Sequence, residues 1–147
     1  MKRILLIICL AFTSYATNAQ GEIDDIVDSF FKNYEEKGAT YALDSLYGIN
    51  KWIDLKGSAM ITLKEKMETL TEDFIGKYYG YELIVEKTLA DSFILRSYLI
   101  KYERQPLRFT FQFYKPNKKW MVLNFKYDGL VGEEIEEAAK LYHFRLN

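Results

Sequence analysis

The chain has 147 residues, 49% of them apolar, and it carries 20 Lys and Arg against 21 Asp and Glu. That length suits one domain, and an apolar content that includes 12 Tyr and 10 Phe excludes a disordered or collagen-like chain. With a single His and a single Cys, catalysis or metal binding that depends on imidazole or thiolate groups is not expected.

Residues 1–19 have the features of a secretory signal peptide. A positively charged start precedes an apolar stretch at residues 4–12, and Thr17-Asn18-Ala19 offers small side chains at the cleavage positions. We expect export to the periplasm or the extracellular space, with cleavage after Ala19 and one domain over residues 20–147. The cysteine would leave with the signal, and no later apolar stretch is long enough to span a membrane.

Three helices are predicted next. Residues 22–36 place apolar side chains at helical spacing, and Gly38 follows where a helix end is expected. A shorter helix fits Ala39–Gly48, and a third is predicted to begin at Ser58 and to end at Gly76 or Gly80. The core-facing side chains of the first helix are Ile23, Ile26, Val27, Phe30, Phe31 and Tyr34. Those of the third are Met60, Leu63, Met67, Leu70 and Phe74.

From Tyr81 onward the apolar residues alternate with a period of two, which is typical of strands. Strands are predicted at 81–89 and 93–102, and a hairpin follows whose loop is Pro116-Asn117-Lys118. This three-residue loop places Phe113 opposite Met121, Phe111 opposite Leu123 and Phe109 opposite Phe125. The sheet side of the core is then formed by Phe109, Phe111, Leu123 and Phe125. A one-residue slip would bury Asn124 instead. The opposite face then carries Arg108, Tyr114, Trp120 and Val122.

The residues after Gly132 predict a short C-terminal helix. Four glutamates come first and Lys140, His143 and Arg145 come last, which is the order that suits the helix dipole. The fold class is therefore α+β: N-terminal helices packed on a curved four-strand antiparallel meander sheet, with a short closing helix.

This order of elements resembles the NTF2-like superfamily, also called the cystatin-like α+β cone. The stretches that carry the resemblance are Phe30–Leu46, an aromatic helix followed by Gly and a second helix, and Phe111–Phe125, which includes the strand Lys119-Trp120-Met121-Val122-Leu123. The resemblance implies a curved sheet wrapped around the first helix and a cone whose mouth holds a ligand or a catalytic group. It also implies pairing through the sheets, as in many members.

Catalytic members of that superfamily use an Asp base with a Tyr or His partner in the cone. The resemblance therefore points to Asp44 with Tyr41 or Tyr34. Taken by itself, Asp44 is better interpreted as a solvated helix residue, because carboxylates on helix faces are usually exposed. His143 follows the sheet and does not match the position of the His partner.

Neither a metal nor a cofactor is expected. The glutamates at positions 133–137 are the densest group of carboxylates, but they lack the turn residues of a calcium loop. The glycines are scattered and form no phosphate-binding motif.

The charge is unevenly distributed along the chain. Residues 81–127 carry nine Lys and Arg against four Asp and Glu, whereas residues 20–80 carry seven against twelve. The face with Arg108, Tyr114, Trp120 and Val122 is therefore a candidate ligand or partner surface, and we expect a homodimer through the sheet. A plain solvated sheet face is the alternative. An exported, acidic protein seldom meets nucleic acid, so none is expected as a partner.

Two functions remain open. The first is an exported, non-catalytic module that binds a small apolar ligand or a protein partner, which the scarcity of His and Cys favours. The second is a small lyase or isomerase that uses an Asp/Tyr pair in the cone, which rests on the resemblance alone.

Overall fold

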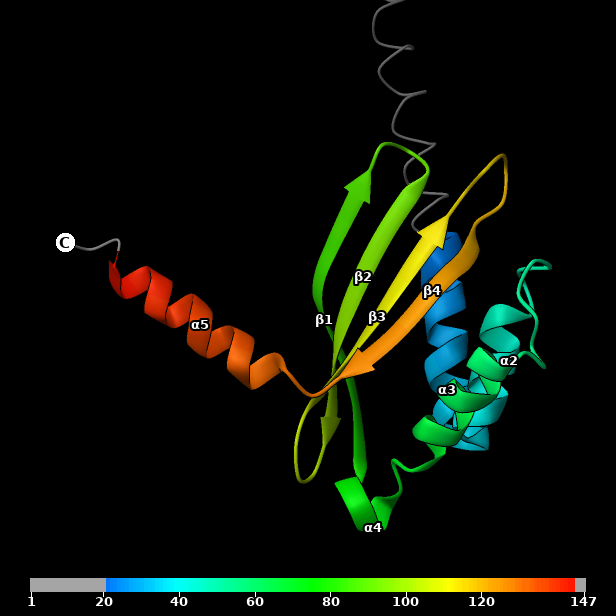
Figure 1. The fold of residues 1–147 in the computed structure, drawn as a ribbon. Helices are drawn as coiled ribbons and strands as arrows, with labels where there is room; N and C mark the ends of the chain where they lie inside the picture. Colours follow the sequence, from blue (N-terminus) through cyan, green and yellow to red (C-terminus); the bar gives the residue numbers. More distant parts are fainter. Residues whose placement is uncertain (1–20, 145–147) are drawn as a thin grey trace, which may run out of the picture.

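The structure, a computed structural model, describes the backbone of residues 21–144 and the side chains of residues 21–141. The predicted signal peptide and its predicted cleavage after Ala19 lie outside these residues. In chain order the elements are a helix at residues 21–37, α2 (Ala39–Tyr47), α3 (Ser58–Glu68), α4 (Glu72–Ile75), β1 (Tyr78–Leu89), β2 (Phe93–Tyr102), β3 (Leu107–Tyr114), β4 (Met121–Asp128) and α5 (Val131–Phe144) (Figure 1).

The four strands form one antiparallel sheet in the order β1-β2-β3-β4, so the predicted meander is confirmed. The helix at residues 21–37 and α2 lie on one side of this sheet (Figure 1). The α+β fold class, with N-terminal helices and a four-strand meander, is likewise confirmed.

An aromatic core lies between the first helix and the sheet. Phe30 packs edge-on against Phe111 at a ring-centroid distance of 5.1 Å, and Phe31 stacks on Tyr81 at 3.6 Å. The predicted inward side of this helix is confirmed, since Ile23, Val27, Phe30 and Phe31 are each buried. Gly38 then separates the helix from α2 with a φ of 87°, a left-handed conformation that favours glycine.

The prediction of one long helix from Ser58 to Gly76 or Gly80 is wrong. Helix α3 ends at Glu68, and the short α4 begins after Thr71, whose side chain accepts a hydrogen bond from the backbone N–H of Phe74. Threonine hydroxyls compete with the helical backbone for hydrogen bonds and so favour helix ends. Phe74 is consequently exposed, Ile75 is buried in its place, and Tyr78 already belongs to β1.

The predicted register of the hairpin is wrong. Phe111 pairs with Phe125, two residues beyond the predicted partner Leu123, and the register shifts between Gln112 and Phe113, so that Phe113 pairs with Val122. A displacement of two residues keeps the same face of a strand inward, so part of the predicted core is still right. Leu123 is the extra residue of a β-bulge, and a bulge reverses the alternation of the strand beyond it. Phe109, Phe111 and Phe125 are buried as predicted, whereas Leu123 is 44% exposed.

The bulge therefore moves two predicted surface residues into the core. Val122 and Trp120 are 0% and 4% exposed, so their assignment to the outer face is wrong. The buried side-chain amide of Asn50 donates to the backbone carbonyl oxygen of Val122 over 2.8 Å, which satisfies a carbonyl next to the bulge.

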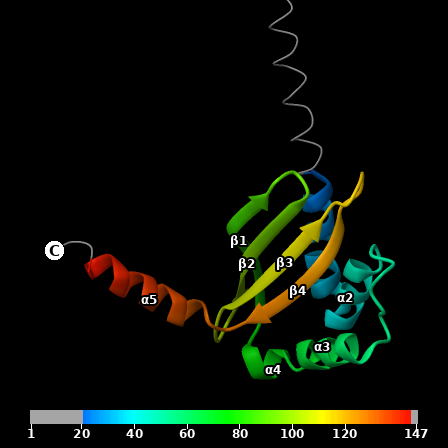
Figure 2. The same cartoon turned by 45° about the horizontal axis from the view of Figure 1, so that its top comes forward.

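Helix α5 forms as predicted, but it does not close the domain. Figures 1 and 2 both show it leading away from the sheet. Its side chains are exposed from Gly132 to Leu141. Within residues 21–144, no helix has both the length and the apolar character needed to cross a membrane.

Candidate functional site

The N-terminal half of the first helix, the end of α2, the loop after it and the start of β4 border a half-open cavity of about 680 Å³. We call it the tryptophan cavity, because both tryptophans of the chain line it. Its apolar lining includes Ile26, Phe30, Leu46, Ile49, Trp52 and Trp120. A cavity of this volume and lining is typical of sites for small organic molecules.

The two tryptophans differ in exposure. Trp52 lies in the loop after α2 and is 78% exposed, whereas Trp120 is 4% exposed. The indole N–H of Trp120 is buried and has no hydrogen-bond partner in the described part of the chain. A buried donor without a partner costs about 1–3 kcal/mol.

Charged side chains of both signs also line the tryptophan cavity. Glu22 and Asp25 come from the first helix, and Lys51 and Lys119 come from the two loops. Lys51 places its ammonium 4.9 Å from the centroid of the Trp52 ring, a distance suited to a cation–π contact. Because the charges nearly balance, the cavity favours neither cations nor anions strongly.

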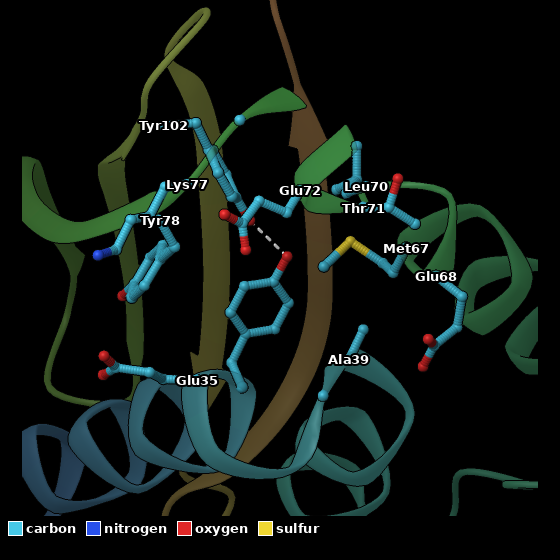
Figure 3. Close-up of a pocket in the computed structure, with 13 residues that line it drawn as sticks. Glu35, Ala39, Met67, Glu68, Leu70, Thr71, Glu72, Lys77, Tyr78 and Tyr102 are labelled. Atoms are coloured by element: carbon cyan, nitrogen blue, oxygen red, sulfur yellow. Dashed lines mark hydrogen bonds between the residues drawn. The ribbon is translucent and has the colours of Figure 1, made fainter. Parts of the chain in front are cut away.

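A second cavity, of about 370 Å³, lies between the end of the first helix, α3, α4 and the adjoining ends of β1 and β2. We call it the tyrosine cavity, after Tyr34, Tyr78 and Tyr102. The hydroxyls of Tyr34 and Tyr102 are hydrogen-bonded over 2.5 Å (Figure 3). Tyr78 packs edge-on against both other rings, at centroid distances of 5.9 and 5.7 Å.

Burial is the main cause that raises the pKa of Tyr34, Tyr78 and Tyr102. These hydroxyls therefore stay protonated at neutral pH and can donate a hydrogen bond, but they do not act as anionic bases. The carboxylates of Glu35, Glu68 and Glu72 also line the cavity, with Lys77 as a cation (Figure 3). This acidic lining suits an apolar ligand less well than the tryptophan cavity does.

The structure does not bring the catalytic candidates together. Asp44 forms an ion pair with Lys64 of α3, which ties α2 to α3. Tyr34 is bonded to Tyr102, while Tyr41 is 48% exposed with the Lys37 ammonium 4.3 Å from its ring centroid. Asp44 and Tyr34 thus each have a different hydrogen-bond partner, and they do not form an acid–base pair with each other.

The four residues predicted for a partner surface are also separated. Trp120 and Val122 belong to the core, as described above. The guanidinium of Arg108 forms ion pairs with two carboxylates of the same chain, Asp128 at 2.9 Å and Glu134. It is therefore already paired and less available to a partner protein. Tyr114 remains 39% exposed at the end of β3.

Sequence reasoning missed the tryptophan cavity, because its walls come from segments that are far apart in the chain. The inward position of Trp120 depends on the bulge, which leaves no mark in a period-two pattern. Among the described residues, no group of His, Cys, Asp and Glu is arranged to hold a metal ion. His143 lies in α5, outside the described side chains.

Comparisons with known proteins add no relative to this picture. A scan of protein-family models finds no match, and searches of curated proteins and of solved structures find no significantly similar chain.

Proposed function

We propose that this chain is an exported, non-catalytic module of the NTF2-like type that binds a small apolar ligand in the tryptophan cavity. The observation that carries the proposal is the buried indole N–H of Trp120, which has no hydrogen-bond partner in the described chain and belongs to a side chain that lines an apolar cavity of about 680 Å³. The ligand would be an apolar molecule with one hydrogen-bond acceptor. The signal-like residues 1–19 support export, and the element order supports the NTF2-like assignment.

The alternative function, a lyase or isomerase with an Asp/Tyr pair, has less support. Its base, Asp44, is neutralised by Lys64, and its tyrosine, Tyr34, is bonded to Tyr102. A general base needs direct access to the proton that it abstracts.

The two tryptophans provide a built-in test. Both line the cavity, so a bound apolar molecule should shift the emission of the exposed Trp52 to shorter wavelength. We would titrate the purified protein with Nile red, an uncharged apolar dye whose carbonyl oxygen is a hydrogen-bond acceptor. Saturable dye fluorescence together with the Trp52 shift is expected.

Ile49→Arg and Ile61→Arg form a matched pair of variants. The two isoleucines are 47% and 46% exposed, but only Ile49 is among the residues that line the tryptophan cavity. Arginine at position 49 should weaken dye binding by at least about tenfold through the burial of a charge, and arginine at position 61 should leave it unchanged. Equal affinities for the two variants, or no saturable binding by the wild type, would contradict the proposal.

A further inference from the structure

The described side chains of helix α5, those of residues 131–141, are largely exposed. Its apolar residues Ile135 and Leu141 are 65% and 66% exposed. Within the described side chains, its hydrogen bonds and ion pairs to the rest of the chain are those of Glu134 with Arg108. Only the first turn is therefore held to the body of the protein.

A helix of this kind is not stable alone in water. Helices shorter than about 12–15 residues are marginal in isolation, and α5 has 14 residues with a glycine in its first turn. Its apolar residues Val131, Ile135, Ala138 and Leu141 follow one another at steps of four, three and three, which places them on one side of the helix. We conclude that α5 is built to cover this stripe against another surface.

Its own sheet is not that surface. Only residues 129 and 130 join β4 to α5, and the Leu130 N–H donates to the Asp128 carboxylate over 3.1 Å. Arg108 then donates to both Asp128 and Glu134 and so fixes the first turn of the helix. From this point α5 leads away from its own sheet (Figure 2). Short connections of this kind favour the exchange of an element between copies.

The outer face of the sheet, away from the first helix, offers a matching surface. Leu89 pairs with Phe93, Phe93 with Tyr114, and Tyr114 with Met121, so one apolar residue from each strand forms a continuous row. We call this set the outer row. Leu89 is 73% exposed and Tyr114 39% exposed. Four strands span about 14–15 Å between their outer axes, and a 14-residue helix is about 21 Å long, so α5 can cross the whole row.

The charges around the two surfaces are complementary. Lys87 lies two residues before Leu89, and Lys118 and Lys119 lie in the loop that leads to Met121. None of these lysines has an ion-pair partner among the described residues. At about 100° per residue, Glu137 lies about 105° from the centre of the apolar stripe of α5 and so flanks it, whereas Glu136 lies about 155° away, on the opposite side. The long side chain of Glu137 can reach the lysines beside the outer row.

We propose that two copies of this chain form a symmetric dimer by exchanging α5, so that the apolar stripe of each helix covers the outer row of the other copy. A second copy is the occupant that carries both surfaces, and twofold symmetry makes the same contact twice. The outer row and its neighbouring lysines share Met121 and Lys119 with the lining of the tryptophan cavity, but the test of the dimer alters neither residue and uses no ligand. It replaces the surface with Trp120 and Val122 that the sequence suggested.

Sedimentation of the purified protein and three variants tests the contact. The wild type is expected to be a dimer at micromolar concentration. The helix variant, Ile135→Asp with Leu141→Asp, and the row variant, Leu89→Asp with Tyr114→Asp, should each raise the dimer dissociation constant by at least about 100-fold. Ile61→Asp on α3 is the control, because it places the same charge at an exposed apolar position outside both surfaces. All altered side chains are exposed, so the fold should persist, as circular dichroism would verify.

A mixing experiment distinguishes exchange from other dimers. The helix variant keeps an intact row, and the row variant keeps an intact helix, so their mixture should form a heterodimer with one of the two contacts. Neither variant should dimerise alone at the same concentration. A monomeric wild type, a dimer that survives either variant, or a mixture without heterodimer would overturn the proposal. A dimer that survives the helix variant would indicate direct pairing of the sheets instead.

Discussion

The most unusual single residue in the core is Arg96. Its side chain is 2% exposed on the face of β2 that meets the first helix, and it pairs with Asp24 and Glu86 at 2.6 Å each. It thereby ties the first helix and β1 to β2. The sequence did not reveal this position, because both faces of residues 93–102 are rich in apolar side chains and the alternation does not decide which face is inside.

Replacing this arginine should be costly. Arg96→Ala leaves Asp24 and Glu86 without their cation and removes the packed stem, and we expect the free energy of unfolding to fall by about 3 kcal/mol. Both carboxylates keep some access to water, which holds the loss at the lower end of the range for buried ion pairs. Urea denaturation would measure the change.

Lys101→Ala is the matched control. Lys101 forms the other β1–β2 ion pair, with Glu82, but these side chains are 41% and 63% exposed. Exposed pairs contribute little, so the loss should stay below about 1 kcal/mol. Equal losses for the two variants would show that Arg96 is not the central ion-pair residue of the core.

The β3–β4 hairpin shows how far patterning predicts an element. The alternation of residues 107–114 predicted the strand and its buried phenylalanines correctly, because a regular strand has a strict period of two. A bulge inserts one residue without changing composition, so it was not predictable from the same pattern. The residue that stabilises it, Asn50, lies 72 positions before Val122 and carries no local signal. Trp120, and with it the tryptophan cavity, was misplaced for the same reason.

Two neighbouring substitutions separate the observed register from the one predicted by the pattern. Val122→Asp places a charge in the core, where Val122 is 0% exposed, and should lower the free energy of unfolding by more than about 3 kcal/mol. Leu123→Asp falls on the exposed bulge residue and should cost less than about 1 kcal/mol. The register without a bulge predicts the reverse order. Chemical denaturation of both variants decides between the two registers.

At the scale of the whole molecule, stability rests on aromatic packing. No cysteine follows Cys9 in the sequence, so residues 20–147 cannot form an internal disulfide. Rings from the first helix and from all four strands join in one cluster, and several tyrosines place their hydroxyls at its edge. Composition predicted such a core, but not that its tyrosines would be partly buried and bonded to one another or to carboxylates, as Tyr81 is to Asp28 over 2.7 Å.

This core should make the protein sensitive to alkali. Burial is the main cause that raises the pKa of six tyrosines within residues 21–141: Tyr34, Tyr47, Tyr78, Tyr81, Tyr98 and Tyr102. Below about pH 10 these hydroxyls are protonated in both the folded and the unfolded chain, so their contribution is constant. Above that pH the unfolded chain loses these protons first, because the folded chain holds them more tightly.

The free energy of unfolding should therefore fall as the pH rises above about 10, by up to about 1.4 kcal/mol per pH unit for each such tyrosine. Urea midpoints between pH 8 and pH 11 would show the decline. Tyr102→Phe keeps the buried ring but removes one of these protons, so its decline should be shallower than that of the wild type. Tyr79→Phe, at a position that is 57% exposed, is the control and should keep the wild-type slope. Parallel curves for the wild type and Tyr102→Phe would contradict this account, because the alkaline loss would then arise outside the aromatic core.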